Sequence, residues 1–147
     1  MAMNLINLSR AGLGVAAVGV VILVFRGSLL ASGGIAIGVQ VGSTLLMLWA
    51  RLSFGRRSFH AAADATEGGL VTWGPYKYLR HPIYAAVLYF LWAGVLTHLG
   101  IINGLSGALV TVGLAVRMGA EERLVAERYP EYAAYAAHTK RIVPFIL

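Results

Sequence analysis

One run of 22 residues without a charged side chain, from Ser28 to Trp49, constrains this chain more than any other feature. A helix needs about 20 apolar residues to cross the hydrocarbon core of a bilayer. Three further apolar stretches lie at about 11–25, 83–99 and 101–116. Only 12% of the 147 residues are charged, against about 25% in a soluble domain. We therefore predict an all-α integral membrane protein with about four transmembrane helices.

The first and the last two stretches need interpretation. The first begins near Leu5 if the Arg10 side chain reaches the interface. A cleaved signal peptide is an alternative for this stretch, but the second apolar run follows almost at once, which favours a spanning helix. The last two are short, and turns at Leu99-Gly100 and Asn103-Gly104 predict a helical hairpin.

The positions of the basic residues predict the orientation. Four spans put Arg10 on the same side of the membrane as the basic residues of the connector and the tail, and leave only Arg26 on the other side. By the positive-inside rule the richer side is the cytoplasm. We predict one membrane domain: two N-terminal helices (1–50), a cytoplasmic connector (51–82), a hairpin (83–116) and a cytoplasmic tail with an amphipathic helix (117–147). The basic residues concerned are Arg51, Arg56, Arg57, Lys77 and Arg80, and Arg117, Arg123, Arg128, Lys140 and Arg141.

Several classes of site are excluded or disfavoured. The chain has no cysteine, so it has no disulfide and no thiolate metal site. The four histidines lack metal-binding spacing, and His60 with Asp64 is better explained as a solvated helix face. The net charge of +6 includes no long basic run, so we expect no nucleic-acid partner. Small residues in the first two helices predict close helix packing, namely Gly12, Gly14, Gly19, Gly33, Gly34, Gly38 and Gly42.

Two polar motifs flank the hairpin. Arg80-His81-Pro82-x-Tyr84 leads into the third helix, and proline is tolerated in a first helical turn, which places Arg80 and His81 at its mouth. On composition alone, an interface belt of aromatic and basic residues is the better explanation of this motif. Arg117 and Glu121 are spaced i, i+4 and share a helix face. Adjacent carboxylates at a membrane boundary are costly unless they are solvated, paired or bound to a cation. A solvated amphipathic helix is the simplest account.

Together these motifs resemble the isoprenylcysteine carboxyl methyltransferase family, which is related to the phospholipid N-methyltransferases. The resemblance covers about 70–147. It implies S-adenosylmethionine as methyl donor, held on the cytoplasmic side between the connector and the tail. Its motifs are Leu70-Val71-Thr72-x-Gly74-Pro75-Tyr76-x-x-x-Arg80-His81-Pro82-x-Tyr84, then Arg117-x-x-x-Glu121-Glu122, then Tyr132-x-x-Tyr135 and the ending Pro144-Phe145-Ile146.

The resemblance also implies roles for individual residues. Arg117 resembles the arginine that holds the acceptor carboxylate, and it is the residue we expect to act on the acceptor. A supporting group would lie behind the donor-binding residues, comprising Arg80, Glu122, Tyr132, His138 and Arg141. Two departures from the family pattern are Ala86, where glycine is usual, and His138, where a basic residue is frequent. The positions that resemble donor contacts are Leu70, Val71, Tyr76, His81, Pro82, Ile83, Tyr84 and Glu121.

The expected function is methyl transfer to a lipid-like acceptor, first of all a carboxylate such as that of prenylated cysteine. The expected partners are the bilayer and a lipophilic or lipidated acceptor. An amine or thiol acceptor would require a base, for which His81 and Glu122 are the candidates. Two other classes stay open: a membrane reductase of the same architecture with a nicotinamide cofactor, and a membrane scaffold without catalysis.

Overall fold

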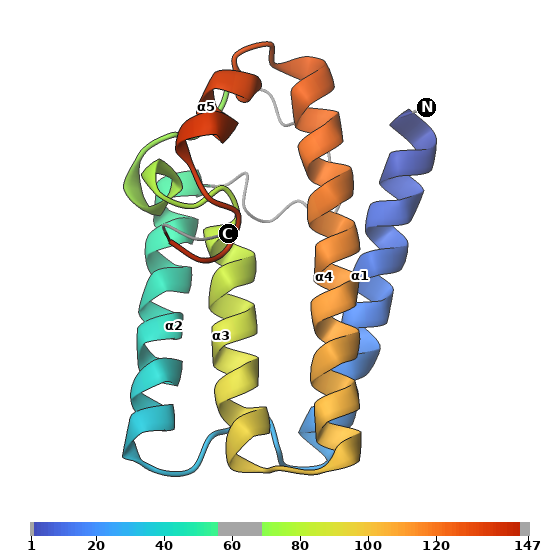
Figure 1. The fold of residues 1–147 in the computed structure, drawn as a ribbon, viewed down its shortest axis with the longest axis vertical. Coiled ribbons are helices and arrows are strands. Elements are labelled where there is room, and N and C mark those ends of the chain that lie inside the picture. Colours follow the sequence, from blue (N-terminus) through green and yellow to red (C-terminus); the bar gives the residue numbers. More distant parts are fainter. Residues whose placement is uncertain (1, 56–68, 145–147) are drawn as a thin grey trace.

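A computed structural model of the chain describes residues 2–55 and 69–144, and helices dominate both ranges. Four long helices stand side by side and alternate in direction (Figure 1). No strand occurs in the two described ranges, which confirms the all-α prediction. The elements are α1 (Ala2–Phe25), α2 (Gly34–Phe54), the 3-10 helix η2 (Gly74–Lys77), α3 (Pro82–Thr97), α4 (Ile101–Arg128) and α5 (Tyr132–His138). His60 and Asp64 lie outside the described residues.

The chain is a multi-pass membrane protein. The segments Met3–Phe25, Gly34–Phe54 and Ile101–Arg128 are long and apolar enough to cross a membrane. The apolar helix α3 has 16 residues, which corresponds to about 24 Å at 1.5 Å per residue, somewhat less than the ~30 Å hydrocarbon core. The outer faces of the bundle carry exposed apolar side chains such as Val21 and Leu45, as contact with lipid requires. The expectation of about four transmembrane helices therefore stands.

The helix α2 begins at Gly34, six residues later than Ser28, because the intervening residues form a turn. The side chain of Gln40 holds this turn. Its Nε2 donates to the carbonyl of Leu29 at 2.8 Å, and its Oε1 accepts the backbone N–H of Ala31 at 3.0 Å. The apolar run thus includes a loop that hydropathy alone does not separate from the helix.

The hairpin between α3 and α4 turns only at 98–100, and Asn103 lies inside α4. Asn103 Nδ2 donates to Ser28 Oγ at 2.9 Å and to the carbonyl of His98 at 2.6 Å. Its Oδ1 accepts from Arg26 Nε at 2.7 Å. The prediction of a turn at Asn103 was wrong. Asn103 lies in the first turn of α4, and its side chain joins the loop after α1, at Arg26 and Ser28, to the 98–100 turn. The helix α4 also continues past Val116 to Arg128.

Small residues let α1 and α4 pack closely. A Cβ on Gly113 would lie 2.5 Å from the carbonyl oxygen of Gly12, and a Cβ on Gly19 would lie 2.7 Å from that of Ser106. The packing prediction is confirmed for Gly12 and Gly19. It was wrong for the other five glycines, where an added Cβ meets nothing within 4 Å, namely Gly14, Gly33, Gly34, Gly38 and Gly42. Of these, Gly33 has a φ of 88° at the turn before α2.

The four helices form two closely packed pairs, α1 with α4 and α2 with α3 (Figure 1). A buried apolar cluster joins the pairs and includes Leu88 and Leu91 of α3 and Val110 and Leu114 of α4. We call the end of the bundle where α3 begins the motif end, and the opposite end, with the 98–100 turn, the far end. The helix α5 and the C-terminal segment lie at the motif end (Figure 1).

Candidate functional site

The start of α3 positions the first motif. Pro82 occupies the first turn and is fully buried, and His81 is the N-cap residue. The preceding 3-10 helix begins at Gly74, whose φ of 61° favours glycine. A Cβ there would collide with the Ser53 side chain on α2. Arg80 and His81 therefore lie at the mouth of α3, as the sequence predicts.

The C-terminal segment pairs with the residues that lead into α3. The backbone N–H of Arg80 donates to the carbonyl of Lys140 at 2.6 Å, and that of His81 donates to Arg141 at 3.0 Å. In return, the N–H of Lys140 donates to Tyr78 at 3.1 Å. These parallel contacts hold the tail against the Arg-His-Pro motif. No local sequence signal predicts them, because the paired segments are about 60 residues apart.

Glu122 joins the tail, α4 and the start of α3. Its Oε1 accepts from Arg80 Nε at 3.0 Å and from His81 Nε2 at 3.2 Å. Its Oε2 accepts from a terminal guanidinium nitrogen of Arg141 at 2.8 Å. The Glu122 side chain is 13% exposed, so water competes weakly for it. The bond to Glu122 raises the pKa of Arg141. Donors on both oxygens stabilise the ionised carboxylate, which makes Glu122 an anchor for the tail.

Arg80 also contacts the C-terminal end of α5. One terminal nitrogen of its guanidinium donates to the carbonyls of Ala136 and Thr139 at 2.7 and 2.6 Å. These carbonyls lie at the C-terminal end of α5, where helix carbonyls lack intrahelical partners. Arg80 thus caps α5 while it pairs with Glu122, and couples the position of α5 to the start of α3.

Tyr84, Arg117 and Glu121 form a second cluster. Its carboxylate, Glu121, is the residue before Glu122 on α4. The Tyr84 hydroxyl donates to Glu121 Oε1 at 2.6 Å and accepts from Arg117 Nε at 2.6 Å. Arg117 Nε lies 3.0 Å from Glu121 Oε1. The i, i+4 pair is confirmed, but the expected solvated face was wrong, because Arg117 is only 5% exposed. The ring of His81 stacks on that of Tyr84 at 5.7 Å and brings the two clusters into contact.

An apolar cluster lies beside these charges, at the motif end of α2. Ala50, Val71 and Tyr76 are buried there, with Phe54 and Ile83 packed against them. The rings of Phe54 and Tyr76 are 5.4 Å apart. This arrangement offers apolar and aromatic walls next to a carboxylate, which suits a ligand with an aromatic base and a cationic group.

Tyr135 was not among the predicted site residues, although it belongs to the Tyr132-x-x-Tyr135 motif. Its hydroxyl donates to the backbone carbonyl of Tyr76 at 2.7 Å and so ties α5 to the apolar cluster. Burial raises the pKa of Tyr135 to about 12, and burial also raises the pKa of Tyr76. Both hydroxyls therefore keep their protons at neutral pH.

The structure brings most of the predicted residues to the motif end. Leu70 is half-buried and precedes Val71. Burial, followed by the charge of Glu122, raises the pKa of Tyr132. His138 is exposed and bonds within α5 to the carbonyl of Ala134, so it does not join these clusters. Ala86 is buried within α3. Residues 145–147 of the tail motif lie outside the described part, within which no group of three metal-ligating side chains occurs.

Comparison with known proteins identifies a family. The family model described as "Isoprenylcysteine carboxyl methyltransferase (ICMT) family" matches residues 35–127. The matched range is more than half of the chain and includes the Arg80–Tyr84 motif and the Arg117–Glu122 motif. No curated protein and no solved structure matches the chain.

Proposed function

Because the chain belongs to the isoprenylcysteine carboxyl methyltransferase family, we propose that it transfers a methyl group from S-adenosylmethionine to the carboxylate of a lipid-like acceptor, such as prenylated cysteine. Family membership and the apolar helices already indicate a membrane methyltransferase. The identities of the methyl donor and of the acceptor are what we propose. The observation that carries them is the cluster of Tyr84, Arg117 and Glu121, which lies next to the apolar cluster around Tyr76.

The donor would bind between the connector, the start of α3 and α4. Glu121 offers a carboxylate to the amino group or the ribose, and only Arg117 and Tyr84 compete for it among the bonds described above. Val71, Tyr76 and their apolar neighbours offer walls for the adenine. Leu70, Pro82 and Ile83 would complete these walls, and His81 would contact the donor beside Tyr84. When bound, S-adenosylmethionine supplies an activated methyl group.

Arg117 would hold the acceptor. Its Nε is fixed by Tyr84 and Glu121, and this sets the plane of the guanidinium. A planar guanidinium matches a carboxylate with two parallel hydrogen bonds, which a lysine ammonium cannot reproduce. Arg117 is buried at the motif end of α4, where its charge would attract a carboxylate carried by a membrane-embedded chain.

The hydrogen bonds of His81 and Glu122 favour a carboxylate over an amine or thiol acceptor. An amine or thiol must lose a proton during transfer, which requires a base. The two candidate bases bond to each other at 3.2 Å, and Glu122 also accepts from Arg80 and Arg141. An ionised carboxylate attacks without a base. The protein then contributes orientation, which is worth up to about 7–11 kcal/mol in well-oriented reactions.

Binding of the demethylated product, S-adenosylhomocysteine, tests the donor site. Calorimetry on detergent-purified protein should show binding to the natural chain and at least tenfold weaker binding to Glu121→Gln, since a charged hydrogen bond contributes ~1.5–3 kcal/mol. The matched control is Glu131→Gln, an exposed carboxylate at the start of α5 that caps nothing with its side chain. Equal affinity in both variants, with unchanged circular dichroism, would remove Glu121 from the site.

Methyl transfer tests the acceptor. Farnesylcysteine with a free carboxylate and an acetylated amine should accept a labelled methyl group, and its methyl ester should neither accept it nor compete. If the ester competes as well as the acid, the carboxylate is not recognised. A reductase or a scaffold would give no methyl transfer with any acceptor.

A further inference from the structure

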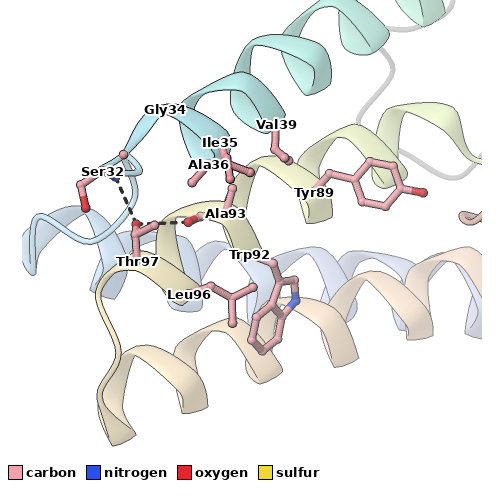
Figure 2. Close-up of a pocket in the computed structure, with 11 residues that line it drawn as sticks. Ser32, Gly34, Ile35, Ala36, Val39, Tyr89, Trp92, Ala93, Leu96 and Thr97 are labelled. Atoms are coloured by element: carbon pink, nitrogen blue, oxygen red, sulfur yellow. Dashed lines mark hydrogen bonds between the residues drawn. The ribbon is translucent and has the colours of Figure 1, made fainter.

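A groove of about 580 Å³ lies between α2 and α3 in the far half of the bundle (Figure 2). The helix α2 contributes Gly34, Ala36 and Val39, and α3 contributes Tyr89, Trp92 and Leu96. Its volume falls within the ~300–1,000 Å³ range of small-molecule sites. No charged side chain lines it, and its walls are almost wholly apolar.

The surroundings of the groove define the chemistry of what can fill it. It opens between two apolar helices, and its rim includes the exposed side chains of Ile35 and Leu96. Hydrocarbon therefore surrounds its mouth in the membrane. An empty groove would forfeit dispersion contacts along its walls, and water would find few polar partners there. A flexible hydrocarbon chain satisfies both conditions.

The groove stays separate from the charged clusters at the motif end. On α3 its lining residue closest to that end is Tyr89, and on α2 the lining stops at Val39. The Tyr89 hydroxyl donates to the backbone carbonyl of Ile142 in the tail. Ile142 itself packs against the core cluster between the helix pairs. The tail thus contacts Tyr89, which lines the inner end of the groove, and a chain lying in the groove would extend toward the far end.

The far mouth of the groove has no charged side chain in its lining that could select a lipid headgroup. The backbone N–H of Ser32 donates to Thr97 Oγ1 at 3.2 Å, and this hydroxyl donates to the carbonyl of Ala93 at 3.2 Å. Figure 2 shows this chain of bonds at the groove's outer edge. Because no charged side chain lines the groove, its mouth offers no ionic contact that would favour one headgroup over another.

We propose that this groove binds one acyl chain of a bilayer phospholipid, which enters from the far end of the bundle and is held without headgroup selection. The inference does not depend on methyl transfer. A bound chain would fill the space between α2 and α3 and support the wall that carries Tyr89, and through it the Ile142 carbonyl of the tail.

Photolabelling of the full chain in vesicles of phosphatidylcholine tests the proposal, with a diazirine placed either near the start or near the end of one acyl chain. Adducts should concentrate on 34–39 and 89–97. The shallow probe should favour Leu96 and the deep probe Tyr89. Labelling no denser than on the exposed α1 face at Val18 and Val21, or a reversed order of depth, would overturn the assignment.

Two glycines of α2 provide a matched pair of variants. An added Cβ meets nothing within 4 Å at Gly34 or at Gly38, but only Gly34 lines the groove. Gly34→Phe should reduce the groove adducts at least fivefold, and Gly38→Phe should leave them unchanged. Equal labelling in both would refute the site. Ala36→Leu is a smaller filling variant in case Gly34→Phe does not fold.

A competition experiment distinguishes the two possible sources of a hydrocarbon chain in the groove, a bilayer phospholipid and the prenyl tail of the acceptor. Excess farnesylcysteine should leave the groove adducts in place, because the proposed occupant is a phospholipid. If farnesylcysteine removes them, the groove holds the acceptor tail and the proposal is wrong. Replacing phosphatidylcholine with phosphatidylglycerol should change labelling less than twofold, and a strong preference for either would contradict binding without headgroup selection.

Discussion

Glu122→Gln should loosen the start of α3 and, with it, the C-terminal segment that pairs with this start. The substitution keeps the size of the side chain and removes the charge toward which Arg80, His81 and Arg141 point. It also places an NH₂ group among donors, since an amide has only one acceptor oxygen. The backbone pairing between 78–81 and 140–141 would then have to hold the tail with weaker support from side chains.

The magnitude follows from the exposure of the three donors. A hydrogen bond to a charged group contributes ~1.5–3 kcal/mol, and a neutral one ~0.5–1.5 kcal/mol. The side chains of Arg80 and His81 are 14% and 10% exposed, so water screens their hydrogen bonds to Glu122 only weakly, and each contributes its full free energy to stability. Arg141 is 54% exposed, and its pair adds little. Losing roughly 1 kcal/mol at each buried bond, plus the misplaced NH₂, gives about 2–3 kcal/mol.

Hydrogen exchange in detergent measures this loss directly. The amides of Arg80, His81 and Lys140 are bonded only across the two segments, so their exchange reports opening of the tail. A change of 1.4 kcal/mol is a factor of ten, so 2–3 kcal/mol predicts about 30- to 140-fold faster exchange at these amides. Amides of the α1–α4 core, such as Val110, should not change.

Glu131→Gln is the control, because Glu131 is exposed and its side chain makes no cap bond. It should leave the tail amides protected. Unchanged exchange at Lys140 in Glu122→Gln would refute the anchoring role. A uniform increase that includes Val110 would show that Glu122 supports the whole bundle and not the tail specifically.

Three further predictions concern the acceptor, helix packing and orientation. Arg117→Lys should lose at least tenfold in methyl transfer with donor affinity nearly intact, and near-full activity would contradict its role. Gly113→Ala should lower unfolding stability by about 1–3 kcal/mol, since its Cβ would meet the α1 backbone, whereas Gly14→Ala, with open space around it, should be neutral or mildly stabilising in the same denaturation assay. In intact cells an impermeant thiol reagent should label Ser32→Cys and not Thr72→Cys, both exposed positions, and the opposite pattern would invert the proposed orientation.

The sequence determined the class of fold, because the physics of the bilayer acts on local stretches. An uncharged run of 22 residues already requires a membrane or a large core. Pro82 marked the start of α3, since proline suits a first turn. The i, i+4 spacing of Arg117 and Glu121 predicted their pair, because helix geometry alone brings them together. Each of these inferences needs only residues within one or two turns.

Tertiary structure decided which side chains are free to react and which are anchors. Glu122 was a candidate base, but its donors come from the start of α3 and from the tail, about 40 and 20 residues away. Gly12 and Gly14 are equivalent in the sequence, yet only Gly12 faces α4. The groove between α2 and α3 also exists only because these two helices pack together, and the tail contacts just the hydroxyl of Tyr89 at its inner end. Burial and charge pairing depend on which distant segments pack together, and local hydropathy and spacing carry no information about that.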